Sequence, residues 1–235
     1  MTTVYLIRHG QVENNITGIL NGNRSDQALN DTGVTQAKAL APYFAGKKID
    51  YILASSMLRA HQTAALTFGK EMNEIDATDD LREIDFGKYD GMPYNEVQQN
   101  PLWFHEGIGQ GYPGGGESWE GVKQRACRAL LRAIEGHRDG AIALVSHGMC
   151  LSLLLMAIFD LTNDQYANIC AQSNTGVHRL SVGDEGTVTV EEWNYDAHLA
   201  PFHAQIKDCP GLATVRRTAS CGSLEHARQW AVGKK

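Results

Sequence analysis

The chain has 235 residues, 43% of them hydrophobic, and a formal net charge of −6. This length suits one large domain or two small ones with a substantial core, and we expect a single domain over residues 1–235. The acidic balance argues against a surface built for nucleic acid or for an acidic membrane. Any anion site must therefore be confined to one local pocket.

Cysteine content and hydropathy point to a compartment. The five cysteines are an odd number without a C-x-x-C pair, which indicates reduced thiols; a disulfide between Cys209 and Cys221 is a minor alternative. The chain enters a strand-like segment with no basic leader, and its longest apolar run, residues 151–159, is too short to cross a bilayer. We expect a cytoplasmic protein with no membrane partner.

Strand-like runs alternate with amphipathic helical patterns along the chain, which is typical of a layered α/β fold with a mainly parallel sheet. In the first part of the chain we predict a strand at 4–7, a helix at 30–46, a strand at 51–54, a helix capped by Ser55 and Ser56, and a short strand within 74–85 ending near Glu83. A loop at 107–116 then leads to a helix at about 118–137, a strand at 142–145 and a helix at 151–159. The last predicted elements are a hairpin of 176–182 and 187–193 at a sheet edge and a helix at 223–232. The tail at 197–235 has no evident role.

Two histidines each follow an apolar strand and directly precede a glycine, in Arg8-His9-Gly10 and in Ser146-His147-Gly148. The carboxyl ends of neighbouring parallel strands open into one crevice, so we expect the two rings to meet there. A lone histidine after a strand most often only ends it, but a pair with an adjacent arginine favours a site. An imidazole is readily kept neutral and nucleophilic near pH 7.

Phosphoryl chemistry follows from the charges that can converge on this crevice. The groups at strand ends or helix starts are Arg8, His9, Arg59 and His147. Together they would offer the positive charge and N–H donors that suit a phosphate dianion, and a neutral His9 could attack phosphorus. Glu83 is the best candidate to protonate the leaving oxygen, because a dianionic ligand nearby would favour its protonated form. Asp85 is a rival acid.

Five motifs occur in a fixed order along the chain. They are Arg8-His9-Gly10 with Asn15 and Gly18; Ser55-Ser56 with Arg59-Ala60 and Gln62-Thr63-Ala64; Leu81-Arg82-Glu83-Ile84 with Phe86-Gly87 and Asp90-Gly91; Pro113-Gly114-Gly115-Gly116-Glu117-Ser118; and Ser146-His147-Gly148. Each is weak alone, but the ordered set is specific. From Thr3 to about Leu199 the sequence resembles the histidine phosphatase superfamily, also called the phosphoglycerate mutase-like family.

The resemblance implies a fold and a set of roles. The fold is a three-layer α/β/α sandwich with a mainly parallel central sheet. The implied roles are phosphorylation of His9, a phosphoryl clamp of Arg8, Arg59 and His147, proton donation by Glu83, and pocket contacts from Asn15 and Gly148. No cofactor and no metal are implied, and a zinc site using both histidines lacks further ligands at suitable spacing. A metalloenzyme remains a minor alternative.

Three departures and one insertion bear on specificity. Val12 stands where many relatives place a threonine, and the run of three glycines before Glu117 has one more than the commoner pattern. The segment at 82–91 looks like the phosphatase branch of the family, which favours hydrolysis. Residues 88–117 are expected to form a substrate cap, with Trp103, His105 and Tyr112 as candidate contacts, although aromatic residues there more often pack.

The sequence therefore predicts a phosphomonoester hydrolase that acts on a small phosphorylated metabolite through a phosphohistidine. A cofactor-dependent phosphoglycerate mutase is the alternative in the same class, because it shares the first half-reaction. A non-catalytic phospho-ligand-binding protein is the alternative from another class. The natural substrate and the oligomeric state, including a homodimer, stay open.

Overall fold

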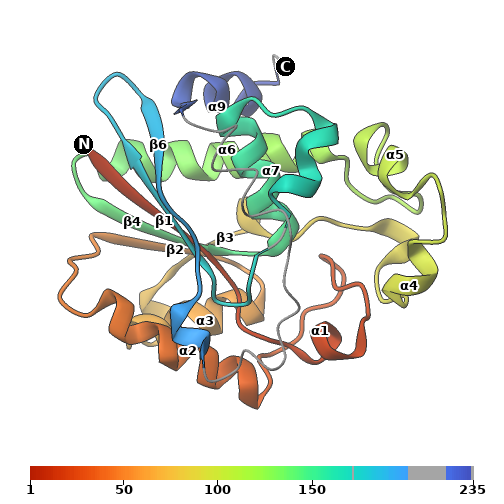
Figure 1. Cartoon of the computed structure of the whole chain (residues 1–235), viewed down its shortest axis with the longest axis horizontal. Helices are drawn as coiled ribbons and strands as arrows, with labels where there is room; N and C mark the ends of the chain where they lie inside the picture. The colour runs from red at the N-terminus through yellow and green to blue at the C-terminus, as the bar shows by residue number, and fades with distance from the viewer. Residues whose placement is uncertain (171, 201–220, 234–235) are drawn as a thin grey trace.

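A central sheet with helices on both faces organises the chain (Figure 1), whose computed structural model describes residues 1–235 except 171, 201–220 and 234–235. The elements are β1 (Thr2–Arg8), α1 (Glu13–Thr17), α2 (Asp31–Phe44), β2 (Tyr51–Ser55), α3 (Leu58–Phe68), β3 (Asp76–Thr78), α4 (Tyr94–Val97), α5 (Trp103–Ile108), α6 (Trp119–Gly136), β4 (Ala141–Ser146), α7 (Gly148–Phe159), β5 (Val177–Val182), β6 (Thr187–Tyr195), β7 (Gly222–Ser223) and α9 (Leu224–Ala231). Cys209 and most of the predicted tail lie outside the described residues.

The seven strands follow the order β3-β2-β4-β1-β5-β6-β7. Strands β3, β2, β4 and β1 are parallel neighbours, whereas the hairpin β5–β6 and the short β7 continue the sheet with antiparallel pairs. The register pairs Arg8 of β1 with Ser146 of β4. Both strands thus end at the same edge of the sheet, and His9 and His147 directly follow the two strand ends.

The predicted three-layer α/β/α arrangement is confirmed. Helices α2 and α3 cover one face of the sheet, and α6, α7 and α9 cover the other (Figure 1). Side chains of β1 alternate between the layers: Val4 and Leu6 join the core with α6 and α7, whereas Tyr5 and Ile7 join the core with α2 and α3. Within the described residues, no helix is both long and apolar enough to cross a bilayer.

Two element boundaries near the site differ from the sequence prediction. Strand β3 ends at Thr78, whose hydroxyl accepts the N–H of Asp80 at 3.2 Å and starts a 3-10 turn, so the prediction that the strand ends near Glu83 is wrong. The helix after β2 has Met57, not Ser55 or Ser56, as its N-cap. Ser55 instead ends β2, and its hydroxyl lies 2.9 Å from His147 Nε2.

The segment at 88–117 projects beside the carboxyl edge of the sheet and carries α4 and α5 (Figure 1). Gly87 fixes where this segment begins, because its φ is +60° and a Cβ there would lie 2.0 Å from the Pro113 carbonyl oxygen. Trp103 and Tyr112 pack together with ring centroids 4.6 Å apart. They are 4% and 2% exposed, so both belong to the hydrophobic core beneath the segment.

Candidate active site

The two histidines lie together at the carboxyl edge of the sheet, with ring centroids 5.2 Å apart. The backbone N–H of His9 donates to the Ser146 carbonyl at 2.9 Å, which ties the end of β1 to the end of β4. The His9 Nδ1 lies 2.7 Å from the Gly10 carbonyl oxygen. A carbonyl can only accept, so this contact places the proton on Nδ1 and leaves a lone pair on Nε2.

Both imidazoles are held in the neutral form. Burial, then the nearby Arg59 and Arg8, lower the pKa of His9 well below its usual 6.5. Burial and Arg59 lower the pKa of His147 in the same way. Because a charged ring would be desolvated beside guanidinium groups, each histidine keeps a lone pair near pH 7.

Arg59 and His147 are fully buried beneath His9 and contact each other. The Arg59 Nε donates to His147 Nδ1 at 3.1 Å, so the His147 proton is on Nε2 and points to the Ser55 hydroxyl. The Arg59 Nη atoms donate to the carbonyls of Ser25 at 2.8 Å and Gly22 at 3.2 Å. Burial lowers the pKa of Arg59 to about 10, which still leaves it charged at pH 7. A phosphoryl contact from His147 requires one of these bonds to be exchanged, whereas Nη1 of Arg59 carries a second N–H beyond the one donated to Ser25.

Arg8 and Glu83 complete the charged groups of the site. Arg8 Nη1 donates to the Gln172 carbonyl, while its Nε is buried without a hydrogen-bond partner among the described residues. The Glu83 carboxyl accepts backbone N–H bonds from Met149 at 3.1 Å and Cys150 at 2.9 Å. These N–H groups belong to the first turn of α7, the helix that directly follows His147. The N-terminus of α7 thus holds the candidate acid beside the histidine pair.

A cavity of about 300 Å³ opens over these groups. Its lining residues are Arg8, His9, Asn14, Asn15, Gly18, Ile19, Leu20, Asn21, Glu83, Phe86, Tyr94, Gly148, Met149, Tyr166 and Cys170. The set includes five of the residues that the sequence assigned to the site. Arg59 and His147 lie below it.

The remaining candidates lie elsewhere. Trp103 and Tyr112 are core residues, and His105 is exposed on α5; none of the three lines the cavity. The rival acid Asp85 also lies outside the lining, and its carboxylate pairs with Arg24 Nε at 2.8 Å. The geometry therefore favours Glu83 over Asp85 as the acid.

Sequence reasoning missed two asparagines that contact this site. Asn21 lines the cavity, and both its amide nitrogen and oxygen are buried without a hydrogen-bond partner among the described residues. The Asn174 Nδ2 donates to the His9 carbonyl at 2.9 Å and thereby supports the turn after β1. Both residues lie in irregular segments, where periodicity gives no signal; only their amide chemistry could have drawn attention to them.

A partly buried ion pair that the sequence did not reveal holds the acid segment. Arg125 of α6 donates to both carboxylate oxygens of Glu117, at 2.8 and 2.9 Å, and to the Glu83 carbonyl at 3.1 Å. Glu117 in turn accepts the Asp85 N–H at 3.0 Å. The glutamate of the glycine-rich motif is thus coupled to the candidate acid.

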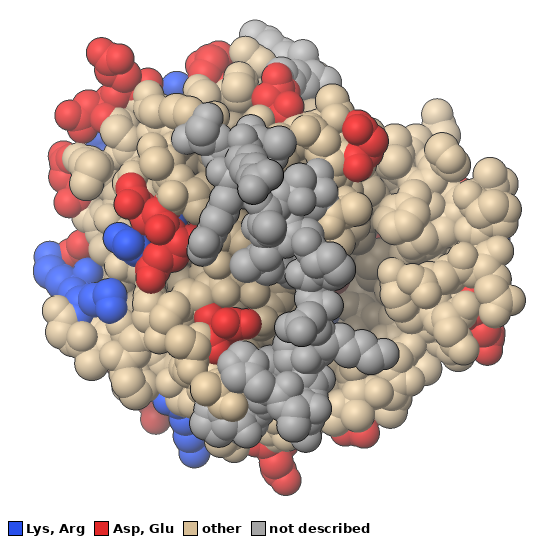
Figure 2. All heavy atoms as spheres, in the orientation of Figure 1, with Lys and Arg blue, Asp and Glu red and all other residues tan. Residues whose placement is uncertain are grey.

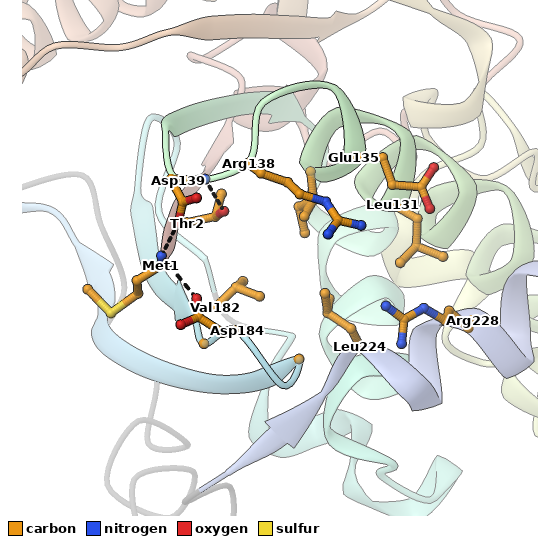
Figure 3. Close-up of a pocket in the computed structure, with 13 residues that line it drawn as sticks. Met1, Thr2, Leu131, Glu135, Arg138, Asp139, Val182, Asp184, Leu224 and Arg228 are labelled. Atoms are coloured by element: carbon orange, nitrogen blue, oxygen red, sulfur yellow. Dashed lines mark hydrogen bonds and ion pairs between the residues drawn. The ribbon is translucent and has the colours of Figure 1, made fainter.

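A second cavity, of about 160 Å³, lies at the opposite edge of the sheet, between the end of α6, the β5–β6 turn and α9 (Figure 3). The seven residues of β1 separate it from His9 by roughly 20 Å. The Met1 amine donates to Asp139 and to Asp184, and Arg138 lies across the opening (Figure 3). Its charged groups are exposed and of both signs, and the described residues that line it include no histidine.

Comparison with known proteins identifies the family of the chain. The model of the histidine phosphatase superfamily (branch 1) matches residues 4–196. The chain belongs to the histidine phosphatase superfamily.

Its relatives differ in length and in how much of them the chain covers. It is 31% identical over 163 residues, 68% of this chain, to a bifunctional protein of Mycobacterium tuberculosis, of which it spans only 44%. It is 28% identical over 197 residues to a putative phosphoserine phosphatase 2 of Hydrogenobacter thermophilus, covering 81% of this chain and 94% of that protein. A solved structure of phosphoserine phosphatase from Entamoeba histolytica with 3-phosphoglyceric acid has a TM-score of 0.75 at 26% identity, covering 85% of this chain and 100% of that one.

Proposed function

We propose that this chain is a phosphomonoester hydrolase that transfers the phosphoryl group of a small metabolite to His9 and then to water. The observation that carries the proposal is the neutral His9 ring, whose Nδ1 proton is held by the Gly10 carbonyl and whose Nε2 carries the lone pair. The adjacent Arg8 has a buried Nε–H with no partner among the described residues. The names of the relatives as phosphatases support the same activity.

The first half-reaction forms a bond between His9 Nε2 and phosphorus while the ester P–O bond breaks. The leaving oxygen takes the proton of the Glu83 carboxyl, so the product alcohol departs neutral. Arg8 and Arg59 stabilise the charge on the equatorial oxygens, a contribution that is usually a large share of phosphoryl-transfer catalysis. Asn15, Asn21 and the amino end of α7 at Gly148 supply further donors to the phosphoryl group.

The second half-reaction returns the enzyme to its starting state. Water attacks phosphorus, the P–N bond breaks, and the Glu83 carboxylate takes the proton that the water loses. His9 regains its lone pair, and inorganic phosphate leaves. A phosphoglycerate mutase would differ only in this step, because a bound acceptor alcohol would replace water.

Rapid-quench labelling during turnover tests the mechanism. We expect an acid-labile phosphoramidate on His9 that forms and decays at least as fast as kcat, and its absence in His9→Asn together with a fall in kcat of about 10⁴-fold or more. Turnover without a trapped phosphohistidine would contradict the proposal. Transfer between phosphoglycerates without phosphate release would assign the mutase reaction, and binding without turnover would assign a phospho-ligand-binding protein. Loss of activity with a chelator, restored by zinc, would assign a metalloenzyme.

The organisation of the chain is part of the same proposal. We propose one domain over 1–235, with 88–117 as the cap and 197–235 as an extension. The buried thiols of Cys127 and Cys150 support a reducing, cytoplasmic compartment.

A further inference from the structure

The wall of the catalytic cavity beyond His9 is apolar and partly aromatic. The residues that form it are Leu20, Phe86, Tyr94, Met149 and Tyr166. Tyr94 begins α4 and is 39% exposed, and Tyr166 lies in the 3-10 helix that follows α7. Tyr94 lies in the cap and Tyr166 in the segment after α7, whereas Leu20 follows α1, Phe86 precedes the cap and Met149 lies in the first turn of α7. Tyr94 and Tyr166 can therefore vary without disturbing the groups that carry the chemistry.

Tyr94 is held in place at the mouth of the cavity. Its backbone N–H donates to the Gly18 carbonyl at 2.8 Å, and a β-bridge joins Ile19 to Pro93. These contacts fasten the start of α4 to the loop after α1. A backbone fixed in this way keeps the Tyr94 side chain beside the cavity and reduces the conformational entropy lost on ligand contact.

Charges in the cavity are concentrated at its phosphoryl end. Among the described residues that line it, Arg8 is the only arginine or lysine, and Glu83 adds a carboxyl. The other polar side chains of the lining include the carboxamides of Asn14, Asn15 and Asn21. A second anionic group on the ligand would lie near Glu83 and the phosphoryl group with no additional cation in this lining, which opposes its binding. Carboxamides instead suit hydroxyl groups.

An exposed apolar side chain also lies beside the cavity. Phe104 of α5 is 45% exposed. The Phe104 ring lies 6.1 Å from Tyr166, which lines the cavity. On the face shown in Figure 2, the cap side on the right is formed mostly by uncharged residues. An apolar group that enters would exchange water for these side chains.

We infer that the substrate is the phosphate monoester of an uncharged alcohol with an apolar or aromatic body, rather than a phosphorylated acid such as phosphoserine or phosphoglycerate. This inference rests on the proposed phosphatase activity. The cavity volume of about 300 Å³ limits the body to a small molecule.

Three alkyl phosphates with poor leaving groups provide the test. They are 2-phenylethyl phosphate, ethyl phosphate and 3-phosphoglycerate, and phosphate release gives kcat/KM for each. The alcohol of 3-phosphoglycerate is the better leaving group, so chemistry alone would favour it. We expect 2-phenylethyl phosphate to exceed ethyl phosphate by about tenfold or more, and 3-phosphoglycerate by a larger factor.

Variants of Tyr94 show whether the wall produces this preference. Tyr94→Ala should lower the ratio of kcat/KM for 2-phenylethyl over ethyl phosphate by roughly tenfold, whereas Tyr94→Phe keeps the ring and should keep the ratio. Leu102→Ala is the matched control, because Leu102 is 56% exposed in the same cap and does not line the cavity. It should behave as the parent chain.

The outcomes separate this inference from the proposed function. Failure to release phosphate from any ester, including p-nitrophenyl phosphate, would refute the phosphatase activity itself. A kcat/KM for 3-phosphoglycerate or phosphoserine above that for 2-phenylethyl phosphate would leave the phosphatase intact and overturn the substrate class. An unchanged ratio in Tyr94→Ala would overturn the role of the wall.

Discussion

The two edges of the sheet differ in whether their charged side chains are buried or exposed. At the carboxyl edge, Arg59 is fully buried, and within the described residues neither it nor Arg8 forms an ion pair with a carboxylate. At the amino edge, Arg138 and Asp139 are exposed to solvent. Burying a cation without a counter-ion costs stability. A bound anion would offset this cost, because it would supply the missing negative charge. The comparison therefore indicates that the carboxyl edge binds the phosphoryl group.

Substitution of Arg59 is the strongest test of this difference between the two edges. Replacing it with methionine should lower kcat/KM by roughly 10³-fold or more, because the transition-state charge loses a buried guanidinium. The matched change at the amino edge, Arg228→Met, should leave kcat/KM within about twofold. Steady-state phosphate release on both purified variants measures the difference. Equal losses would show that the two edges are not functionally distinct.

A folding defect must be separated from the loss of a catalytic contact. Arg59 donates to the carbonyls of Ser25 and Gly22, so Arg59→Met also leaves backbone acceptors unpaired. Arg59→Lys keeps the charge but loses the planar fork. If the lysine variant has the parent circular dichroism spectrum and still loses most of its kcat, the guanidinium geometry is responsible. Parent-like kcat in that variant would contradict the proposed clamp.

Glu83 tests whether the carboxyl edge also supplies a proton. Glu83→Gln should lower kcat by about 10² to 10⁴-fold for alkyl phosphates. For p-nitrophenyl phosphate, whose leaving group needs no proton, the loss should be below about tenfold. Comparison of the two substrates in the same variant measures the acid directly. Equal losses would make Glu83 a binding residue only, and Asp85→Asn then becomes the next variant to assay.

The sequence predicted the site residues that lie at strand ends, but not the contacts that support them. The turn residues Arg8, His9 and His147 were recognisable because apolar strands lead into them, and periodicity gives the ends of strands. The Arg125–Glu117 pair was not recognisable, because it joins the loop before α6 to a buried position within that helix. Trp103 and Tyr112 are only candidate cap contacts from the sequence, which leaves packing as the commoner alternative, and the structure places both in the core. Each of these two contacts joins an irregular segment to a helix, so no regular periodicity reveals it.

Acid should lower the free energy of unfolding, because neutral histidines are buried near the carboxyl edge of the sheet. His178 of β5 pairs with Leu6 across the sheet, and burial lowers its pKa to about 3. The unfolded chain binds the proton below about pH 6.5 and the folded chain does not, so the free energy of unfolding falls as the pH drops from about 6.5 towards 3. At pH 5 this group alone contributes a loss of roughly 2 kcal/mol.

His178→Asn isolates that contribution, because an asparagine can still accept the N–H that Asn194 donates to His178 Nδ1 at 3.1 Å. Urea unfolding at pH 7.5 and pH 5 gives the free energy of unfolding of each protein. The variant should lose roughly 2 kcal/mol less than the parent between these pH values. His105→Asn, at an exposed position of α5, should follow the parent. Parallel pH slopes for all three would exclude His178 as a source of acid sensitivity.

The smallest effect is expected at the amino-edge cavity. Arg138 is exposed and forms no side-chain hydrogen bond or ion pair within the described residues, so Arg138→Ala removes only solvated charge. We expect kcat/KM within about twofold of the parent and a Tm within about 2 °C of it. Because the cavity lies roughly 20 Å from His9, only a coupled movement of β1 could transmit a larger effect. A tenfold loss of kcat/KM with an unchanged Tm would show such coupling and make the amino edge part of the functional machinery.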